Sequence, residues 1–266
     1  MQIPDFTLQP QPTAEQLAFW LEHGCIRFRG VMTEAEIDDL VDAIDELQRA
    51  FIEQDRKTVY GTPLRWSKTP DGQPFISRVA FASMYSERIR EVLSDARFTA
   101  IQAFFGEEYR LAHDEKDGVV INHWLRQPGS TYSRLGWHTD GLRDIFLGQK
   151  LEPMLNVGLY LTDSGLDKGG VRLIPGTHTQ STWQMLTGKL HFLDNRPDPR
   201  EIALTARKGD LTIHDGRLWH RTAQATVEGE ASRRRNLYMA WVKGPRKPRD
   251  PNGAAPLYHH LQGLVG

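Results

Sequence analysis

Trp137-His138-Thr139-Asp140-Gly141 closes a short pattern of strand residues with two side chains that can bind a metal ion. On a β-strand, residues two positions apart point to the same face. His138 and Asp140 can therefore converge on one ion. A His-x-Asp pattern also occurs by chance, so this interpretation needs support from other parts of the chain.

A second histidine, His220, ends another strand pattern, Lys208-Gly-Asp-Leu-Thr-Ile-His-Asp-Gly-Arg-Leu-Trp-His220. It lies far beyond His138 in the chain, so a folded-back sheet would have to bring the two together. Two His and one Asp are the ligands of the facial triad of non-haem Fe(II) oxygenases, which leaves coordination positions open. His138, Asp140 and His220 are thus the candidate metal ligands.

Arginines follow this second histidine, in Arg233-Arg-Arg-Asn-Leu-Tyr-Met-Ala-Trp241. An arginine at the start of that strand can present its planar guanidinium to a carboxylate. Three consecutive arginines on a strand cannot all face inward. One or two of them are therefore predicted to be surface charges.

The strand patterns around these residues indicate a mainly β fold behind a helical N-terminal third. Short runs rich in Val, Ile, Leu, Tyr and Trp alternate with turn residues from about residue 108 onward, which is typical of a sandwich or barrel. The runs cover residues 119–126, 135–140, 155–162, 171–175, 210–214, 217–222 and 234–242. Residues 181–200 interrupt them with a polar insertion, either a surface loop or a lid over a site.

The N-terminal part carries two capping boxes, Thr13-Ala-Glu-Gln16 and Thr33-Glu-Ala-Glu36, each of which predicts the start of a helix. Further helices are expected near 86–94 and 95–105. Cys25-Ile-Arg-Phe-Arg alternates like a short strand. Residues 58–80 contain several prolines and are interpreted as loop and turn.

Composition excludes several classes of protein. The 266 residues include 33 basic and 34 acidic side chains, so no global field attracts nucleic acid or an anionic membrane. No apolar run reaches the roughly 18–20 residues of a membrane span. The single cysteine, Cys25, is most simply explained by a reducing, cytoplasmic compartment. Ten histidines beside one cysteine favour imidazole and carboxylate ligands over a Cys-rich zinc site.

Four segments together resemble the phytanoyl-CoA dioxygenase family of Fe(II)/2-oxoglutarate-dependent oxygenases. Leu21–Ile37 resembles that family's N-terminal strand and helix, and Trp137–Asp140 resembles its metal-binding strand. Asp167–His178 is similar to its Gly-x-Leu…Pro-Gly-Ser/Thr-His signature, and Gly209–His220 to the strand with the distal ligand. The four segments occur in the family's order, and the resemblance covers most of the chain.

The resemblance implies a double-stranded β-helix (jelly-roll) core in a single domain, 1–266. We expect a helical part at 1–107, the core at 108–245 and a tail at 246–266. It also implies Fe(II) held by His138, Asp140 and His220, with 2-oxoglutarate and O₂ as cosubstrates.

The same resemblance implies an arginine that binds the distal carboxylate of 2-oxoglutarate. Aligning Asn-Leu-Tyr after the arginines with the family's strand puts Arg234 in this role, with Arg233 and Arg235 as alternatives. Thr222 matches a position where the family often has a small hydroxyl near the cosubstrate. Asn122 is a further candidate for that pocket.

The implied activity is hydroxylation of a small or medium-sized organic molecule, with release of succinate and CO₂. Related halogenases have Gly or Ala in place of the carboxylate, so Asp140 favours hydroxylation, desaturation or ring closure. The alternatives are a Zn or Mn jelly-roll isomerase or hydrolase with the same triad, and a catalytically silent binding module. The basic cluster Lys243–Arg249 is either a solvated tail or a contact for an anionic substrate such as a CoA thioester. The sequence does not predict the oligomeric state.

Overall fold

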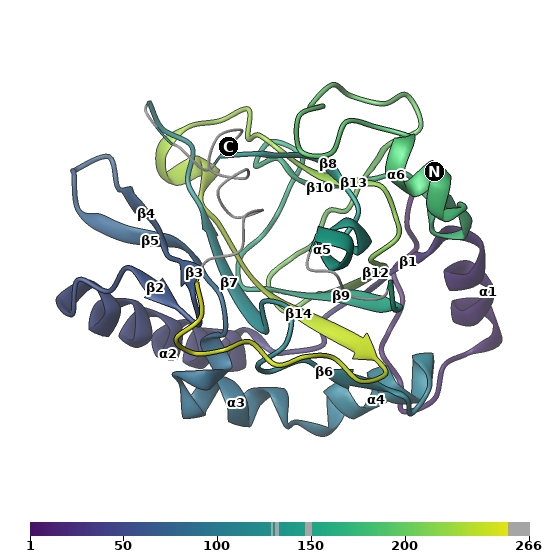
Figure 1. Ribbon diagram of the computed structural model, residues 1–266, viewed down its shortest axis with the longest axis horizontal. Coiled ribbons are helices and arrows are strands. Elements are labelled where there is room, and N and C mark those ends of the chain that lie inside the picture. Colours follow the sequence, from purple (N-terminus) through teal and green to yellow (C-terminus); the bar gives the residue numbers. More distant parts are fainter. Residues whose placement is uncertain (129, 131–132, 147–150, 255–266) are drawn as a thin grey trace.

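Two antiparallel β-sheets form the centre of the computed structural model, which describes residues 1–128, 130, 133–146 and 151–254 (Figure 1). Within these residues, seven strands of the large sheet follow one another in the order β1 (Cys25–Phe28), β12 (Leu211–Asp215), β9 (Met154–Tyr160), β14 (Arg234–Lys243), β7 (Val119–Trp124), β5 (Pro74–Val79) and β4 (Arg65–Lys68). An eighth strand, β6 (Tyr109–Leu111), pairs with β14. The small sheet has the order β11 (Ile202–Ala203), β10 (Gly170–Leu173), β13 (His220–Ala223) and β8 (Leu135–His138).

The four helices of the N-terminal third begin where the sequence predicts them, whereas the two short helices described after residue 140 were not predicted. They are α1 (Ala14–His23), α2 (Glu34–Glu53), α3 (Glu87–Leu93), α4 (Ala96–Phe105), α5 (Gly141–Phe146) and α6 (Thr182–Thr187). Short 3₁₀ turns occupy Ala82–Met84, Thr177–Thr179 and Gly229–Ser232. Both predicted capping boxes form, with Thr13 and Thr33 as the N-caps of α1 and α2. The helices expected near 86–94 and 95–105 are confirmed as α3 and α4.

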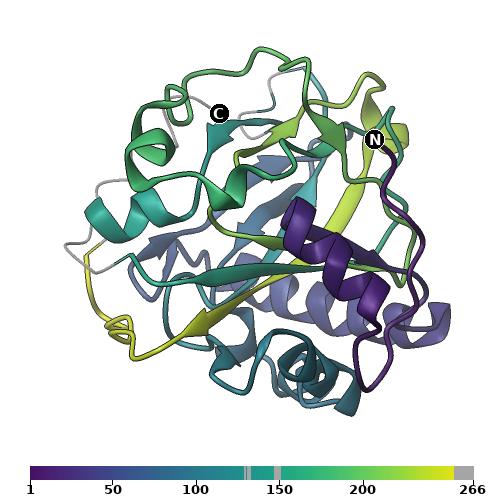
Figure 2. The same ribbon diagram turned by 90° about the vertical axis from the view of Figure 1, so that its right-hand side faces the viewer.

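One face of the large sheet packs against helices. Figures 1 and 2 place α2, α3 and α4 on the same side of the strands. Apolar residues of α2 such as Ile37 and Ile44 join a single buried cluster with Val157, Ile213 and Leu237 of the sheet. Each of these side chains is fully buried, and burial of a large aliphatic side chain is worth about 1.5–3 kcal/mol.

The other face of the large sheet looks toward the small sheet. Side chains from β7, β9, β12 and β14 and from β8, β10 and β13 line one cavity between the two sheets. Strands from the far ends of the chain therefore meet around a common interior. The prediction of a mainly β fold with the strand runs between 119 and 242 is confirmed.

The N-terminal third is more than a helical cover, because β1 pairs with β12 and β5 pairs with β7 in the large sheet. The interpretation of residues 58–80 as loop and turn was wrong. They form the small hairpin β2 (Thr58–Val59) with β3 (Thr62–Pro63), and then the hairpin of β4 and β5. A turn at 70–72 joins β4 and β5, and these two strands have too little apolar alternation to be recognised.

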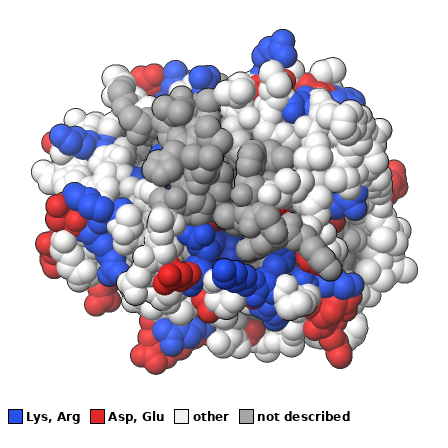
Figure 3. All heavy atoms as spheres, viewed as in Figure 1, with Lys and Arg blue, Asp and Glu red and all other residues white. Residues whose placement is uncertain are grey.

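Among the described residues visible in Figure 3, basic and acidic side chains lie interspersed. In the part of the chain with described coordinates, every helix is too short or too polar to cross a bilayer. The predicted tail lies outside the described residues from position 255 onward.

Candidate metal centre

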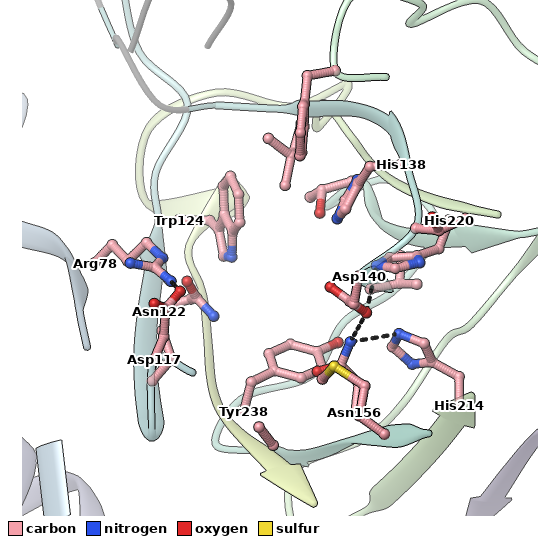
Figure 4. A pocket seen from close by; sticks show the side chains of 18 of the residues that line it. Arg78, Asp117, Asn122, Trp124, His138, Asp140, Asn156, His214, His220 and Tyr238 are labelled. Carbon is pink, nitrogen blue, oxygen red and sulfur yellow. Dashed lines mark hydrogen bonds and ion pairs between the residues drawn. The ribbon is translucent and has the colours of Figure 1, made fainter. Parts of the chain in front are cut away.

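Neighbouring strands of the small sheet bring the three predicted ligands together. His138 ends β8 and His220 begins β13, and the two residues are direct partners in the antiparallel register. Asp140 follows two positions after His138. One ligand atom from each side chain lies within 4.8 Å of the others. Figure 4 shows the three side chains close together on one side of the cavity. The pairing of β8 with β13 thus brings together ligands that lie far apart in the sequence.

Both histidines are oriented by their own backbone. The Nδ1 atom of His138 lies 2.8 Å from the carbonyl oxygen of Gly136, and the Nδ1 atom of His220 lies 2.9 Å from that of Leu218. A carbonyl can only accept, so each Nδ1 carries the proton and each Nε2 has its lone pair free for a metal. This tautomer fits a divalent cation bound between Nε2 atoms and a carboxylate.

Burial keeps the imidazoles of His138 and His214 neutral. Desolvation, together with the nearby His220, lowers the pKa of His138 well below its usual range. Desolvation and His220 likewise lower the pKa of His214 to about 3. Metal binding requires the neutral imidazole, so no proton has to be displaced from His138 at neutral pH.

Asp140 is held from two sides. Its backbone N–H donates to the carbonyl oxygen of Gly216 at 2.8 Å. Its carboxylate oxygen Oδ2 accepts a hydrogen bond from Nδ2 of Asn156 at 2.5 Å and lies 3.7 Å from Nε2 of His220. The carboxylate therefore sits close to the histidine nitrogens in a fixed orientation.

The side chains of the three consecutive arginines point to alternate faces of the strand. Arg233 pairs with Glu230, and Arg235 pairs with Asp45 of α2 on the helix-covered face. Arg234 is 2% exposed and lines the cavity. Its guanidinium lies 5.1 Å from the centroid of the Trp124 ring, a cation–π contact. Of the three candidates, only Arg234 lines the cavity among the described residues.

Thr222 and Asn122 also line this cavity, on opposite sheets. Thr222 lies on β13, two positions after His220. Asn122 lies on β7, and its Nδ2 atom donates to the side-chain oxygen of Asn236 at 3.2 Å. Their proposed contacts with a cosubstrate stay predictions.

The insertion at 181–200 covers the metal centre. The backbone N–H of Phe192 donates to the carbonyl oxygen of Trp137 at 2.7 Å, and that of Trp137 donates to the carbonyl oxygen of Asp194 at 2.8 Å. Gly136 permits this close approach, because a Cβ there would lie 2.2 Å from the carbonyl oxygen of Phe192. The ring of Phe192 stacks on His138 with centroids 5.0 Å apart. Of the two interpretations of this segment, the structure favours a lid.

The far wall of the cavity contains polar residues that the sequence analysis missed. Arg78 of β5 donates to a carboxylate oxygen of Asp117 at 2.7 Å, and both side chains are mostly buried (Figure 4). Tyr238 and Asn156 line the same space. Asn156 and Tyr238 had a recognisable signal, since each is a polar residue between apolar neighbours on a predicted strand. Arg78 had none, because its strand was interpreted as loop.

Most of the basic cluster at 243–249 is engaged within the molecule. Arg246 forms a buried ion pair with Asp144, and Lys243 pairs with Glu108. The guanidinium of Arg249 donates to the carbonyl oxygen of Tyr60 at 3.3 Å. These contacts argue against a docking site for an anionic substrate there.

Comparison with known proteins agrees with this geometry. The sequence profile of the family described as phytanoyl-CoA dioxygenase (PhyH) matches residues 20–234. A curated relative, Dioxygenase af480 of Aspergillus fumigatus, is 23% identical over 275 residues, which covers 98% of this chain and 80% of the relative.

Two solved structures show the same fold at low sequence identity. The non-haem α-ketoglutarate-dependent carbocyclase SnoK from nogalamycin biosynthesis aligns with a TM-score of 0.65 and 17% identity, over 96% of this chain and 92% of SnoK. EvdO2 from Micromonospora carbonacea var. aurantiaca, solved with 2-oxoglutarate, aligns with a TM-score of 0.62 and 16% identity, over 91% of this chain and 95% of EvdO2. The predicted jelly-roll core is confirmed.

Proposed function

The chain belongs to the phytanoyl-CoA dioxygenase family of Fe(II)- and 2-oxoglutarate-dependent dioxygenases, and from this premise we propose how its own residues divide the work. His138, Asp140 and His220 hold the Fe(II). Arg234 binds 2-oxoglutarate, and the remaining cavity takes the substrate. The observation that carries this assignment is the convergence of the three ligand side chains at one end of a cavity that Arg234 also lines.

The metal site is supported by its donor set and by the orientation of each donor. Two Nε2 lone pairs and one carboxylate match the facial triad of non-haem iron enzymes, which leaves further positions for the cosubstrate and O₂. When bound, Fe(II) supplies the reactivity that couples decarboxylation of 2-oxoglutarate by O₂ to oxidation of a substrate C–H bond. The protein supplies orientation, through the backbone contacts of both imidazoles and through Asn156.

Arg234 is suited to the distal carboxylate of 2-oxoglutarate. A buried guanidinium offers a planar set of donors, and its attraction to a carboxylate is strengthened by the low local dielectric. The stacking of Arg234 on Trp124 restricts the rotation of the guanidinium. Thr222 adds a hydroxyl to the same pocket, and Asn122 adds an amide from the opposite sheet.

We propose that the substrate is a small or medium-sized organic molecule that is hydroxylated in the same cavity. Trp124, Met154 and Phe192 give the cavity apolar walls, while Arg78 with Asp117 gives it a polar end. Such a mixture is typical of sites that orient an oxygenated small molecule. The lid that carries Phe192 excludes water from the reacting centre. Asp140 occupies the third ligand position, which favours hydroxylation, desaturation or ring closure over halogenation.

Two predictions about the whole protein accompany this assignment. The chain is proposed to work as one domain over 1–266, with residues 108–245 as its jelly-roll core. A cytoplasmic location is proposed from the single cysteine, Cys25, which is buried in β1.

Succinate formation tests the proposed function. The protein is incubated with 2-oxoglutarate, O₂ and either Fe(II) or Zn(II), and succinate is quantified. We expect slow formation of succinate with Fe(II) even without a substrate, and none with Zn(II) or under nitrogen. A protein that forms no succinate with Fe(II), but hydrolyses or isomerises a compound with Zn(II) or Mn(II), would support the non-oxidative alternative.

A further inference from the structure

Asn156 connects the metal site to the strand behind it. It lies on β9 directly opposite His214 of β12 in the antiparallel register. Its Nδ2 atom is 2.5 Å from Oδ2 of Asp140 and 3.3 Å from Nε2 of His214, and Figure 4 shows it between these two side chains. One amide nitrogen therefore contacts both a predicted metal ligand and a buried imidazole.

Chemistry fixes the direction of both hydrogen bonds. An amide nitrogen carries two hydrogens and no lone pair available for bonding, so it donates to the carboxylate and to the imidazole. If the amide were turned over, its oxygen would face the carboxylate and repel it. His214 contributes to keeping the amide in place, because its Nε2 accepts the second hydrogen.

The position of the donated hydrogen determines how the carboxylate points. Asn156 bonds Oδ2, the same oxygen that lies 3.7 Å from Nε2 of His220. A carboxylate oxygen has two lone pairs, so the bond to Asn156 leaves one of them directed elsewhere. Without this bond, rotation about the Cα–Cβ and Cβ–Cγ bonds would allow the carboxylate of Asp140 to turn away from the histidines.

The strand context argues that Asn156 has a role beyond the fold. Asn is a poor strand former, and its neighbours Leu155 and Val157 show that this strand otherwise favours apolar residues. A β-branched residue would suit the sheet better at this position. A role of the amide in the metal site would explain why Asn stands at a strand position that it does not favour.

We propose that Asn156 is a positioning residue that fixes the Asp140 carboxylate for metal binding, with His214 holding the amide in its orientation. This inference rests on the proposed function, since it requires Asp140 to be a metal ligand. Hydrogen-bonded partners of metal ligands typically change metal affinity about 10- to 100-fold when they are removed.

The test uses Mn²⁺ alone, added to the full-length metal-free protein and followed by calorimetry. We expect Asn156→Leu, which keeps the number and branching of the side-chain heavy atoms but removes the donor, to raise the dissociation constant for Mn²⁺ about 10- to 100-fold. Thr212→Val is the matched control, because Thr212 is a buried polar residue on β12, two positions before His214 and outside the cavity lining. Its affinity for Mn²⁺ should equal that of the wild type.

Thermal unfolding with and without Mn²⁺ separates positioning from a structural role. If Asn156 positions Asp140, Asn156→Leu reduces the increase in melting temperature that Mn²⁺ produces, whatever the melting temperature of the metal-free variant. A variant that melts earlier without metal but keeps the full Mn²⁺-induced increase would overturn the proposal. Equal affinities of Asn156→Leu and the wild type would overturn it as well.

A double variant tests the part assigned to His214. If His214 acts through the amide, adding His214→Leu to Asn156→Leu should weaken Mn²⁺ binding no further. His214→Leu is also measured alone. If its loss of Mn²⁺ affinity adds in full to the loss caused by Asn156→Leu, this role is contradicted. A wild-type protein that binds no Mn²⁺ would contradict the metal site itself, and the inference with it, whereas equal affinities contradict the inference alone.

Discussion

The two faces of the large sheet are both buried, yet they carry different side chains. On β9, β12 and β14, one alternate set of residues is mostly apolar and packs against α2 and its neighbours, as Val157, Ile213 and Leu237 do. The other set includes Asn156, His214, Arg234 and Tyr238, and these residues line the cavity. Because side chains alternate along a strand, each strand contributes to both faces at once.

This difference shows that buried side chains have two different roles in the same sheet. The helix-covered face contributes to the free energy of folding through burial of apolar surface. The cavity face keeps polar groups in a low-dielectric space, where unpaired ones reduce stability but paired ones are strongly oriented. Substitutions on the two faces should therefore change different measured quantities.

The largest effect is expected on the cavity side, at the ligands. Asp140→Ala or His138→Ala should abolish succinate formation, because two remaining donors do not hold Fe(II) in the required arrangement. The melting temperature of the metal-free protein should change little, since neither side chain belongs to an apolar cluster on the helix-covered face. Turnover at the wild-type level in either variant would contradict the assignment of the metal site.

The next effect concerns the helix-covered face. Leu237→Ala should reduce the free energy of unfolding by about 2–5 kcal/mol, because it leaves a cavity in the apolar cluster. Denaturant unfolding measures this loss. The KM for 2-oxoglutarate should stay at the wild-type value in the folded variant, and a large change in KM would show that the two faces are not separable.

A smaller effect is expected at Arg234 and Arg235, two neighbouring residues of β14 whose side chains lie on opposite faces of the sheet. Arg234→Ala removes a charge-assisted contact worth about 1.5–3 kcal/mol, so the KM for 2-oxoglutarate should rise roughly 10- to 150-fold. Arg235→Ala is the matched control, because Arg235 pairs with Asp45 on the other face. Steady-state kinetics of succinate formation give both values, and a raised KM for Arg235→Ala alone would move the carboxylate contact to that residue.

The smallest effect is expected at the exposed ends of α2 and α4, far from the cavity. The hydrogen bonds from Arg97 are the main cause that lowers the pKa of Glu36 to about 2 and that of Asp95 to about 2. A carboxyl group whose pKa is lowered by folding stabilises the folded state at pH values above its unfolded pKa, which is near 4. This stabilisation is lost as the pH falls toward 2.

Arg97→Gln should therefore lower the melting temperature slightly at pH 7, since exposed ion pairs contribute about 0–1 kcal/mol. The difference from the wild type should shrink between pH 5 and pH 2. Melting curves over this range give the answer. A difference that grows toward low pH would contradict the proposed cause.

Much of the fold could be predicted from the sequence, because helix caps and strand alternation are local signals. Thr13 and Thr33 marked two helix starts correctly, and the strand runs after residue 108 were found. Residues 58–80 were misinterpreted, since their strands are short, show little apolar alternation and lie in two hairpins, of which only β5 also pairs with a distant strand, β7. Local patterns do not reveal pairing between distant segments.

The candidate site was predicted where a motif or a family resemblance named a residue, as for His220 and Arg234. Arg78, Asn156 and Phe192 were missed, although residues 181–200, which include Phe192, were expected to form a surface loop or a lid over a site. Their roles depend on which strands become neighbours, as the pairing of Asn156 with His214 illustrates. Such contacts become visible only in three dimensions.

An anaerobic titration of Fe(II) and 2-oxoglutarate tests the central claim most directly. The claim is that the cavity face holds iron at His138, Asp140 and His220, and 2-oxoglutarate at Arg234. We predict that a weak visible charge-transfer band forms when both are present, and that it needs more 2-oxoglutarate in Arg234→Ala. A wild-type protein that shows no band and forms no succinate after O₂ is admitted would contradict the account.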